Sequence, residues 1–326
     1  MKRVAVIGAG LSGLIFARAL SNDVDLTLFE KSRGYGGRMA TRRHDRYRFD
    51  HGTQFFTART EAFADFLSPF IDQGVVARWD ARFVEFCGDQ VSSHRTWGTE
   101  PPHYVGVPGM NALGRALGES LDVRLQTRVA TLQAVDGGWH LRDDQGRDLG
   151  RFDWVACSIP AAQAAVLLPP SFAHYPALEA RDMPGCYALM LGFDRPLPLD
   201  WDAALVREAS ISWISVDSSK PGRDGYCVLV QASNRWAEAN MERDIETVTA
   251  HMLAEVRRVT GQDLSNADYI SLHRWRYANP QRQDGPASLI DTAQRLAVFG
   301  DWCIHGRVEA AYLSGLDAAE RIRSLL

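Results

Sequence analysis

Three glycines near the start of the chain have the spacing of a phosphate-binding turn. Gly8, Gly10 and Gly13 follow a run of β-branched residues and precede a helical pattern. The first glycine permits the turn, the second lets a pyrophosphate approach the backbone, and the third allows tight packing of the helix on the strand. Glu30 ends the next expected strand, where an acid can accept hydrogen bonds from both hydroxyls of an adenosine ribose. The pattern predicts a dinucleotide site of the NAD or FAD kind, because this carboxylate repels a ribose 2′-phosphate.

A second glycine cluster, residues 34–37, is followed by Arg38. A flexible backbone with a fixed cation suits an extended diphosphate that already rests on the first helix. A plain NAD domain does not need this segment, so the cluster favours FAD. Taken alone, a glycine-rich surface turn with a solvated arginine is an equally good interpretation.

Residues at the other end of the chain suit the flavin half of such a cofactor. Gly300 and Asp301 follow an expected strand, where the carboxylate can lie near ribityl hydroxyls and the diphosphate. The last helix begins near Val308, and its first N–H groups and positive dipole end can face the pyrimidine edge of a flavin. There they would stabilise the negative charge that develops as the ring is reduced. The alternative is an ordinary C-terminal helix.

Hydrophobic patterns predict the elements that must position these residues. The first and last elements are strand-then-helix pairs, whereas the middle of the chain is mostly antiparallel. We predict an α/β fold in which a Rossmann-like FAD-binding domain is interrupted by a second, α+β substrate domain with a mainly antiparallel sheet. The expected bounds are 1–60, 103–162 and 278–326 for the first domain, and 61–102 and 163–277 for the second. Expected strands are 3–7, 25–30, 186–193, 211–216, 226–232, 268–277 and 296–299, with a hairpin region at 75–86 and a meander at 123–158. Expected helices are one from residue 11, 61–73, 108–120, 241–260 and one from about 308.

Composition places the chain among globular proteins. Hydrophobic residues make up 46% and charged residues 23% of its 326 residues, which excludes disordered, collagen-like and disulfide-dense classes. The net charge of -4 is spread along the chain, so nucleic acid is not an expected partner. No stretch has the roughly 20 apolar residues of a membrane span. Five scattered cysteines indicate free thiols in a reducing cytoplasm, and the histidines lack metal-ligand spacing, so no metal is expected.

Together the motifs resemble the FAD-binding amine-oxidase-like flavoproteins. That family follows the fingerprint with a Gly-Gly-Arg segment, then an Asp-x-Gly turn, which here is residues 50–56, and ends with Gly300-Asp301 and residues 306–315. The resemblance implies FAD, held non-covalently, because Cys186 lies well before the C-terminal motif where monoamine oxidases attach theirs. The expected cofactor contacts are Gly8, Gly10, Leu11, Ser12, Gly13, Glu30, Lys31, Gly37, Arg38, Met39, Gln54, Phe55, Phe56, Val129, Gly300, Asp301, Arg307, Val308 and Glu309.

Within this family the chain is most similar to the renalases of the bacterial type, over residues 50–59, 273–278 and 300–302. Renalases take hydride from the 1,2- and 1,6-dihydro isomers of NAD(P)H and pass the electrons to O2, giving NAD(P)+ and H2O2. A dihydropyridine is already an activated hydride donor, so the site must only stack it on the flavin, and no catalytic acid or base is predicted. Nothing in the sequence requires an oligomer.

Two other functions stay open on the same fold: an amine or amino-acid oxidase or dehydrogenase, and a non-catalytic flavin-binding redox module. Amine oxidases of the family typically carry a lysine near flavin N5, and none of Lys2, Lys31 and Lys220 fits that role. For the substrate candidates the alternative is a structural role, in the core for Trp97 and Trp275 and on the surface for Arg276. The candidates are Thr57, Ala58, Arg59, Thr96, Trp97, Gly98, Tyr187, Trp275, Arg276 and His305.

Overall fold

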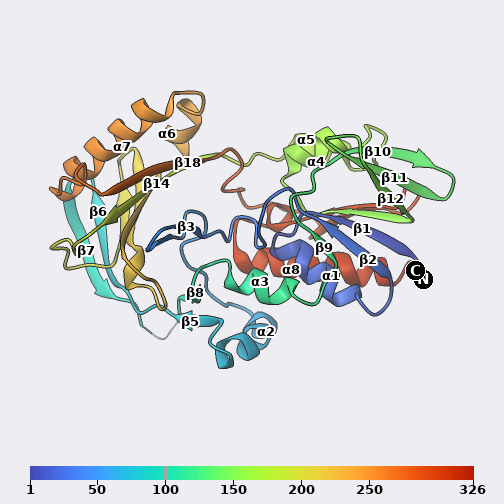
Figure 1. Cartoon of the computed structure of the whole chain (residues 1–326), viewed down its shortest axis with the longest axis horizontal. Helices are drawn as coiled ribbons and strands as arrows, with labels where there is room; N and C mark the ends of the chain where they lie inside the picture. The colour runs from blue at the N-terminus through green and yellow to red at the C-terminus, as the bar shows by residue number, and fades with distance from the viewer. Residues whose placement is uncertain (99–100) are drawn as a thin grey trace. The chain divides into compact units, whose positions relative to one another are not determined.

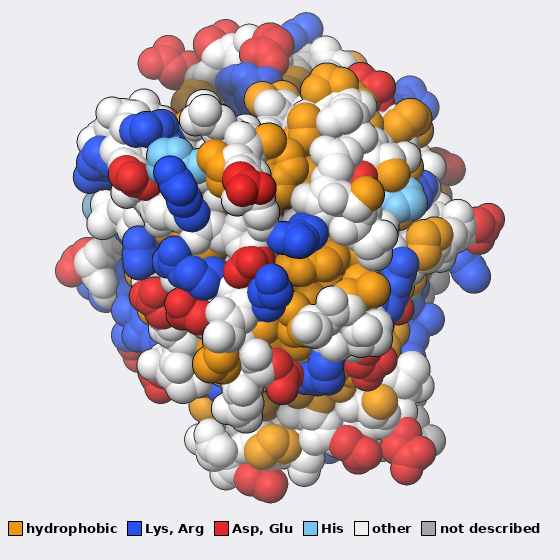
Figure 2. Space-filling model, turned by 90° about the vertical axis from the view of Figure 1, so that its right-hand side faces the viewer, with side chains coloured by type: hydrophobic (Ala, Val, Ile, Leu, Met, Phe, Trp, Pro, Cys, Tyr) orange, Lys and Arg blue, Asp and Glu red, His pale blue; other side chains and the backbone are white. Residues whose placement is uncertain are grey.

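The computed structural model describes residues 1–98 and 101–326, which divide into two compact units (Figure 1). Unit 1 comprises Met1–Arg38, Leu113–Met183 and Pro280–Leu326, and unit 2 comprises Met39–Ala112 and Pro184–Asn279. Among the described residues, no helix combines the length and the apolar character needed to cross a membrane. On the face drawn in Figure 2, basic and acidic side chains are interspersed.

Unit 1 is built on a six-stranded sheet in the order β19-β20-β13-β1-β2-β9, which is parallel except for the antiparallel pair β19 and β20. Helices α1 and α8 pack together so closely that a side chain at Gly315 would lie 2.5 Å from the Ser12 carbonyl oxygen. A separate antiparallel sheet, β10-β11-β12, completes the unit. The elements are β1 (Arg3–Ile7), α1 (Leu11–Leu20), β2 (Asp25–Phe29), α3 (Ala112–Gly118), β9 (Val123–Arg124), β10 (Val129–Val135), β11 (Gly138–Asp143), β12 (Asp148–Phe152), β13 (Trp154–Cys157), α4 (Ala161–Leu167), α5 (Tyr175–Glu179), β19 (Ser288–Asp291), β20 (Leu296–Phe299), η2 (Asp301–Cys303) and α8 (Val308–Arg323).

Unit 2 is built on a seven-stranded sheet in the order β18-β14-β17-β16-β15-β6-β7, in which only β15 and β6 pair in parallel. The elements are β3 (Arg42–His44), β4 (Tyr47–Phe49), α2 (Glu61–Asp72), β5 (Val76–Arg78), β6 (Arg82–Cys87), β7 (Gln90–Thr96), β8 (Tyr104–Gly106), β14 (Cys186–Phe193), β15 (Ala203–Arg207), β16 (Ile211–Val216), η1 (Asp217–Ser219), β17 (Tyr226–Ala232), α6 (Asn234–Ala239), α7 (Ile245–Thr260) and β18 (Tyr269–Trp275).

Both faces of this sheet are covered, as the continuous apolar run of β14 requires. Alternate residues of a strand point to opposite faces. Tyr187 and Leu189 belong to the core that includes buried residues of α7, whereas Ala188 and Met190 pack with Tyr47 and other residues on the second face. The β3-β4 hairpin is therefore fixed to the sheet of unit 2.

The structure confirms the predicted α/β fold class, with a Rossmann-like unit and a second, mainly antiparallel one. The bounds of the units differ from the expected domain bounds in four places, one of which is only residues 278–279, which group with unit 2. Residues 39–60 and 103–112 group with unit 2, because β4 packs on its sheet and β8 pairs with β5. Residues 163–183 group with unit 1, where the Ala173 N–H donates to Asp291 Oδ2 (3.0 Å).

Several expected elements are corrected. The helix expected over 241–260 begins only at Ile245, because the Asp244 side chain accepts a hydrogen bond from the Thr247 N–H (2.8 Å) and caps it there. A separate helix, α6, precedes it. The prediction missed several elements of at most seven residues, namely β3, β4, β7, β8, β15, β19, α4 and α5.

Candidate functional site

The turn between β1 and α1 depends on each of its glycines differently. Gly8 has φ +103, a region that favours glycine, and its N–H donates to the Phe29 carbonyl (2.8 Å). A Cβ on Gly13 would lie 2.1 Å from the Gly8 oxygen, so only glycine allows the helix to start this close to the strand. At Gly10 a Cβ would meet nothing within 4 Å. The turn is thus tightly packed beneath and open above Gly10, which is the space that a pyrophosphate needs.

The start of α1 presents backbone donors to that space. The first intrahelical bond runs from the Leu14 N–H to the Gly10 carbonyl (3.0 Å), so the N–H groups of Leu11, Ser12 and Gly13 precede the helical ladder. Gly10 provides no side-chain cap, and the first turn has no acidic residue. A helix start of this kind, with its positive dipole end, binds phosphate.

Glu30 lies where β2 ends and is almost fully buried. Its Oε2 accepts from the Ala9 N–H (2.8 Å) and its Oε1 from the Ser32 N–H (2.7 Å). A carboxylate can accept about four hydrogen bonds, so capacity remains for the two hydroxyls of a ribose. The Thr127 N–H donates to the Glu30 carbonyl (2.9 Å), which brings the segment leading to Val129 beside this acid.

The second glycine cluster lies directly against the first turn. The Gly36 N–H donates to the Ala9 carbonyl (2.9 Å), and Gly36 forms a bridge with Gly10. Gly37 has φ +58, and a Cβ there would lie 3.2 Å from the Gly10 Cα. Both segments therefore border the same open space, as the interpretation of an extended diphosphate requires.

Arg38 and Asp301 come from opposite ends of unit 1 and form a two-pronged ion pair. Arg38 Nη1 donates to Asp301 Oδ2 (2.9 Å), and Nη2 bonds to Oδ1. Asp301 follows Gly300, whose N–H donates to Ser314 Oγ of α8 (2.8 Å). Helix α8 begins after Arg307, which provides no side-chain cap. Open space at Gly10, two helix starts and the spare acceptors of Glu30 fit a flavin dinucleotide, which these residues would hold.

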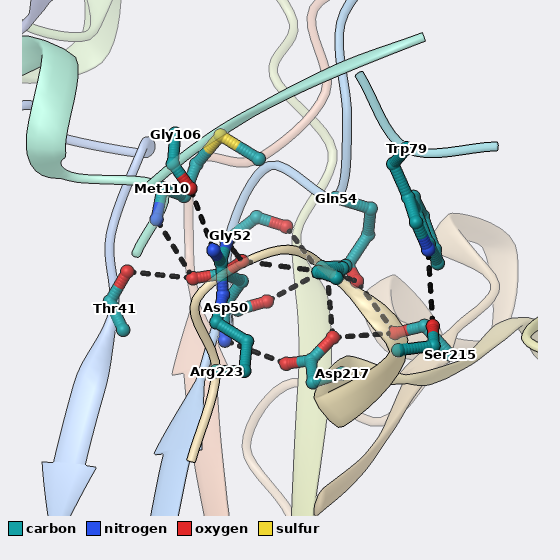
Figure 3. Close-up of polar contacts among 12 residues, drawn as sticks. Thr41, Asp50, Gly52, Gln54, Trp79, Gly106, Met110, Ser215, Asp217 and Arg223 are labelled. Atoms are coloured by element: carbon teal, nitrogen blue, oxygen red, sulfur yellow. Dashed lines mark hydrogen bonds and ion pairs between the residues drawn. The ribbon is translucent and has the colours of Figure 1, made fainter. Parts of the chain in front are cut away.

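Unit 2 fixes the turn of residues 50–56 through a buried ion network, which we define as Asp50, Asp217, Lys220 and Arg223 (Figure 3). Asp50 Oδ1 accepts from Thr41 Oγ (2.7 Å), and its Oδ2 pairs with Arg223 Nη2. The Asp50 N–H in turn donates to Asp217 Oδ2 (2.7 Å). Thr41 and Arg223 thus hold the side chain of Asp50, the first residue of the turn, and Asp217 holds its backbone.

Lys220 contacts both acids of the ion network, and its side chain is completely buried. Its Nζ donates to Asp217 Oδ1 (2.6 Å) and to Gln54 Oε1 (3.2 Å), and lies 3.5 Å from Asp50 Oδ2. Burial alone would raise the pKa of Asp50, but Lys220 and Arg223 hold that pKa below its ordinary value, while burial raises the pKa of Asp217. The two acids and two bases balance, which is how four buried charges are tolerated.

The ion network was not predicted from the sequence. The segment 217–223 looks like a solvated turn, and the only signal was that Lys220 is one of three lysines in the chain. The structure shows that the Gln54 side chain is a partner of this network, because its Oε1 accepts from Lys220 Nζ (3.2 Å). The Gln54 amide also donates to the Gly52 carbonyl (3.0 Å). Gln54 is one of the predicted cofactor contacts, and its side-chain amide has hydrogen-bond partners within unit 2.

Some predicted substrate contacts are core residues in this structure. Tyr187 is fully buried, and its hydroxyl donates to the carbonyls of Asn240 (2.9 Å) and Met241 (3.0 Å). Trp97 is buried and stacks on His103, with ring centroids 3.8 Å apart. Neither side chain is available to stack on a substrate ring.

The other predicted substrate contacts are at least partly accessible. Trp275 is half-buried, and its Nε1 donates to the His51 carbonyl (2.7 Å). Arg276 is exposed and pairs with Glu242 (Nη2 to Oε2, 3.0 Å). Thr57, Ala58 and His305 are half-buried, whereas Arg59, Thr96 and Gly98 are exposed.

The remaining predicted cofactor contacts differ in exposure. Phe55 is half-buried, and its ring lies 4.8 Å from that of Trp97 between centroids. Lys31 is exposed and donates to Gln163 Oε1 (2.9 Å). Within residues 1–98 and 101–326, no three His, Cys, Asp or Glu side chains are grouped as metal ligands. Met39, Phe56, Val129, Val308 and Glu309 are buried, and Arg307 is exposed.

The chain was compared with protein families and with solved structures. Residues 80–323 match the family described as flavin-containing amine oxidoreductase, and residues 6–70 match the NAD(P)-binding Rossmann-like domain. The fold is similar to that of a candidate protoporphyrinogen oxidase from Exiguobacterium sp. 255-15, with 16% identity and a TM-score of 0.79 over 99% of each chain. Wild-type putrescine oxidase bound to putrescine is similar as well, with 13% identity and a TM-score of 0.72 over 99% of each chain. At these identities, the likeness shows the fold alone.

Proposed function

Because the chain belongs to the flavin-containing amine oxidoreductase family and is thus an oxidoreductase, we propose that it is an FAD-dependent oxidase of dihydronicotinamides. Its substrates are the 1,2- and 1,6-dihydro isomers of NAD(P)H, as in renalases. Each turnover takes a hydride from the isomer and a proton from solvent, and yields NAD(P)+ and H2O2 from O2. When bound, the flavin would supply the hydride acceptor and the route of electrons to oxygen.

The state of Lys220 is the observation that favours this substrate class over amines. Unit 2 has no other lysine, and the Lys220 ammonium is buried and bonded to Asp217 (2.6 Å), which is itself buried. It therefore does not act as the lysine that amine oxidases of this family typically place near flavin N5. A dihydropyridine needs no such group, because oxidation restores its aromatic ring without removal of a proton from nitrogen.

The chain's own residues bind and orient in this proposal. The backbone donors at the start of α1 and the Glu30 carboxylate hold the dinucleotide, and Arg38 is fixed by Asp301 beside it. The ion network holds the turn of residues 50–56 in place. The scheme requires no proton transfer by a side chain during hydride transfer.

The proposal is tested by mixing the purified protein, loaded with non-covalently bound FAD, with candidate electron donors under anaerobic conditions. The 1,2- and 1,6-dihydro isomers of NADH should bleach the visible flavin absorbance rapidly, whereas ordinary 1,4-NADH and a panel of amines should not. Bleaching by amines alone would replace the proposed substrate with an amine. If no donor bleaches the flavin, the result would favour a flavin-binding redox module. A protein that cannot be loaded with FAD would contradict the cofactor assignment.

A further inference from the structure

Arg42 is unusual among the arginines of unit 2 in what it contacts. Among the described residues of this unit, four arginines are partly or fully buried: Arg42, Arg48, Arg223 and Arg274. Three of them pair with a carboxylate, namely Asp224, Asp50 and Glu242. Within residues 1–98 and 101–326, Arg42 has only neutral partners, so its charge is not balanced locally.

The neutral partners of Arg42 lie on one face of β18, which is an edge strand of the seven-stranded sheet. Arg42 Nη1 donates to Ser271 Oγ (3.0 Å), and Nη2 lies 3.4 Å from His273 Nδ1. Trp275 follows two positions later on the same face, and its ring centroid is 4.5 Å from that of His273. These side chains are all half-buried, so they remain partly accessible.

Mainly donors remain on this set of side chains. A guanidinium has five N–H donors and no acceptor, and two of those of Arg42 are engaged. Because Arg42 can only donate, His273 Nδ1 must accept, and the ring proton of a neutral His273 is then on Nε2. Ser271 accepts from Arg42 and keeps its own O–H as a donor. A positive, donor-rich cluster is the chemical complement of a phosphate, whose oxygens only accept.

The two neighbouring histidines add no positive charge to that of Arg42, because their pKa values are lowered. Burial, together with the nearby Arg42, lowers the pKa of His273 to about 4. Burial, His273 and Arg42 lower the pKa of His51 to about 3, although Asp50 opposes this. His51 is nine-tenths buried, and its Nδ1 has no hydrogen-bond partner among the described residues. At neutral pH the cluster therefore carries the single charge of Arg42.

We propose that Arg42, Ser271 and His273 form an anion site that binds a phosphate group of the substrate, with Trp275 beside it to contact a planar ring. This inference rests on the proposed function, because it assigns the phosphate to a dihydronicotinamide dinucleotide. Position along the chain supports it, since β3 leads through β4 into the turn of residues 50–56 and the Trp275 indole bonds to His51 in that turn.

Binding of inorganic pyrophosphate to the FAD-loaded protein tests the anion site independently of turnover. Loss of one charge-assisted, two-pronged contact of about 1.5–3 kcal/mol corresponds to a roughly 10- to 100-fold weaker Kd. We expect that loss in Arg42→Ala and partial recovery in Arg42→Lys. Arg43→Ala is the matched control, because Arg43 is the next residue of β3 and lies on its opposite face, and it should bind pyrophosphate like the wild type. Equal binding by the wild type and Arg42→Ala would overturn the proposal.

Kinetics with two substrates identify which phosphate is bound. For 1,2-dihydro-NAD, Arg42→Ala should raise KM roughly 10-fold or more with kcat unchanged, whereas 1,2-dihydronicotinamide riboside, which has no phosphate, should show no change. An equal effect on both substrates, or loss of FAD from Arg42→Ala, would overturn the assignment to the substrate. If no dihydronicotinamide is oxidised but pyrophosphate binding still depends on Arg42, the anion site stands and the proposed function fails.

Discussion

Glu30 is the side chain on which retention of the cofactor should depend most directly. It is buried and already accepts hydrogen bonds from the Ala9 and Ser32 N–H groups. In Glu30→Gln the side chain keeps its shape but loses its charge and half of its acceptor capacity. Since a hydrogen bond to a charged group contributes about 1.5–3 kcal/mol, FAD affinity should fall roughly 10- to 100-fold. Dialysis followed by flavin absorbance measures this, and unchanged retention would remove Glu30 from the site.

Lys220 should instead determine the stability of the protein. In Lys220→Met the carboxylates of Asp50 and Asp217 stay buried with only Arg223 to balance them. Breaking a buried pair by removing one partner costs about 3–5 kcal/mol, which should appear in the free energy of unfolding measured with urea. The control is Arg276→Ala, which breaks an exposed pair with Glu242 and should leave that free energy unchanged. A small effect of Lys220→Met would mean that the ion network is dispensable.

Two substitutions at the start of the first helix should separate cofactor binding from folding: Gly10→Ala should affect binding, and Gly13→Ala should affect stability. Gly10 has φ -70, and a Cβ there meets nothing within 4 Å, so Gly10→Ala should unfold at the wild-type temperature yet retain little FAD. In Gly13→Ala the Cβ would lie 2.1 Å from the Gly8 oxygen, and the forced backbone shift should cost about 1–3 kcal/mol of stability. Thermal unfolding and flavin content measure both variants. Full flavin content in Gly10→Ala would contradict the placement of the diphosphate.

How far each element could be predicted depends on how local its causes are. The glycine turn could be predicted, because φ and close approach are properties of the residues themselves, as Gly8 and Gly13 show. The β3-β4 hairpin could not, because Tyr47 is buried by β14 and β17, which come more than a hundred residues later. The ion network was missed for the same reason, since Asp50 is joined to partners that are distant in the sequence. Long-range burial of charge leaves no periodic pattern.

Across the whole molecule, the buried His51 and the half-buried His273 should make the stability depend on pH. The folded-state pKa is about 3 for His51 and about 4 for His273, below the ordinary value of 6.5. Between these values the unfolded chain binds more protons than the folded protein, so the free energy of unfolding rises with pH. The stability from keeping each ring neutral is complete above pH 6.5 and is lost as the pH falls toward the folded-state pKa.

The double variant His51→Gln, His273→Gln isolates this contribution. Each histidine contributes a slope of up to about 1.4 kcal/mol per pH unit, so the variant should lose stability less steeply than the wild type as the pH falls from 6.5 to 4. Urea unfolding at half-unit pH steps gives both slopes, and carboxylates that titrate in this range cancel in their difference. The comparison uses slopes, so a constant loss of stability in the variant does not affect it. Equal slopes would show that the two rings are not kept neutral in the folded protein. Arg42 would then not be the single positive charge of its cluster.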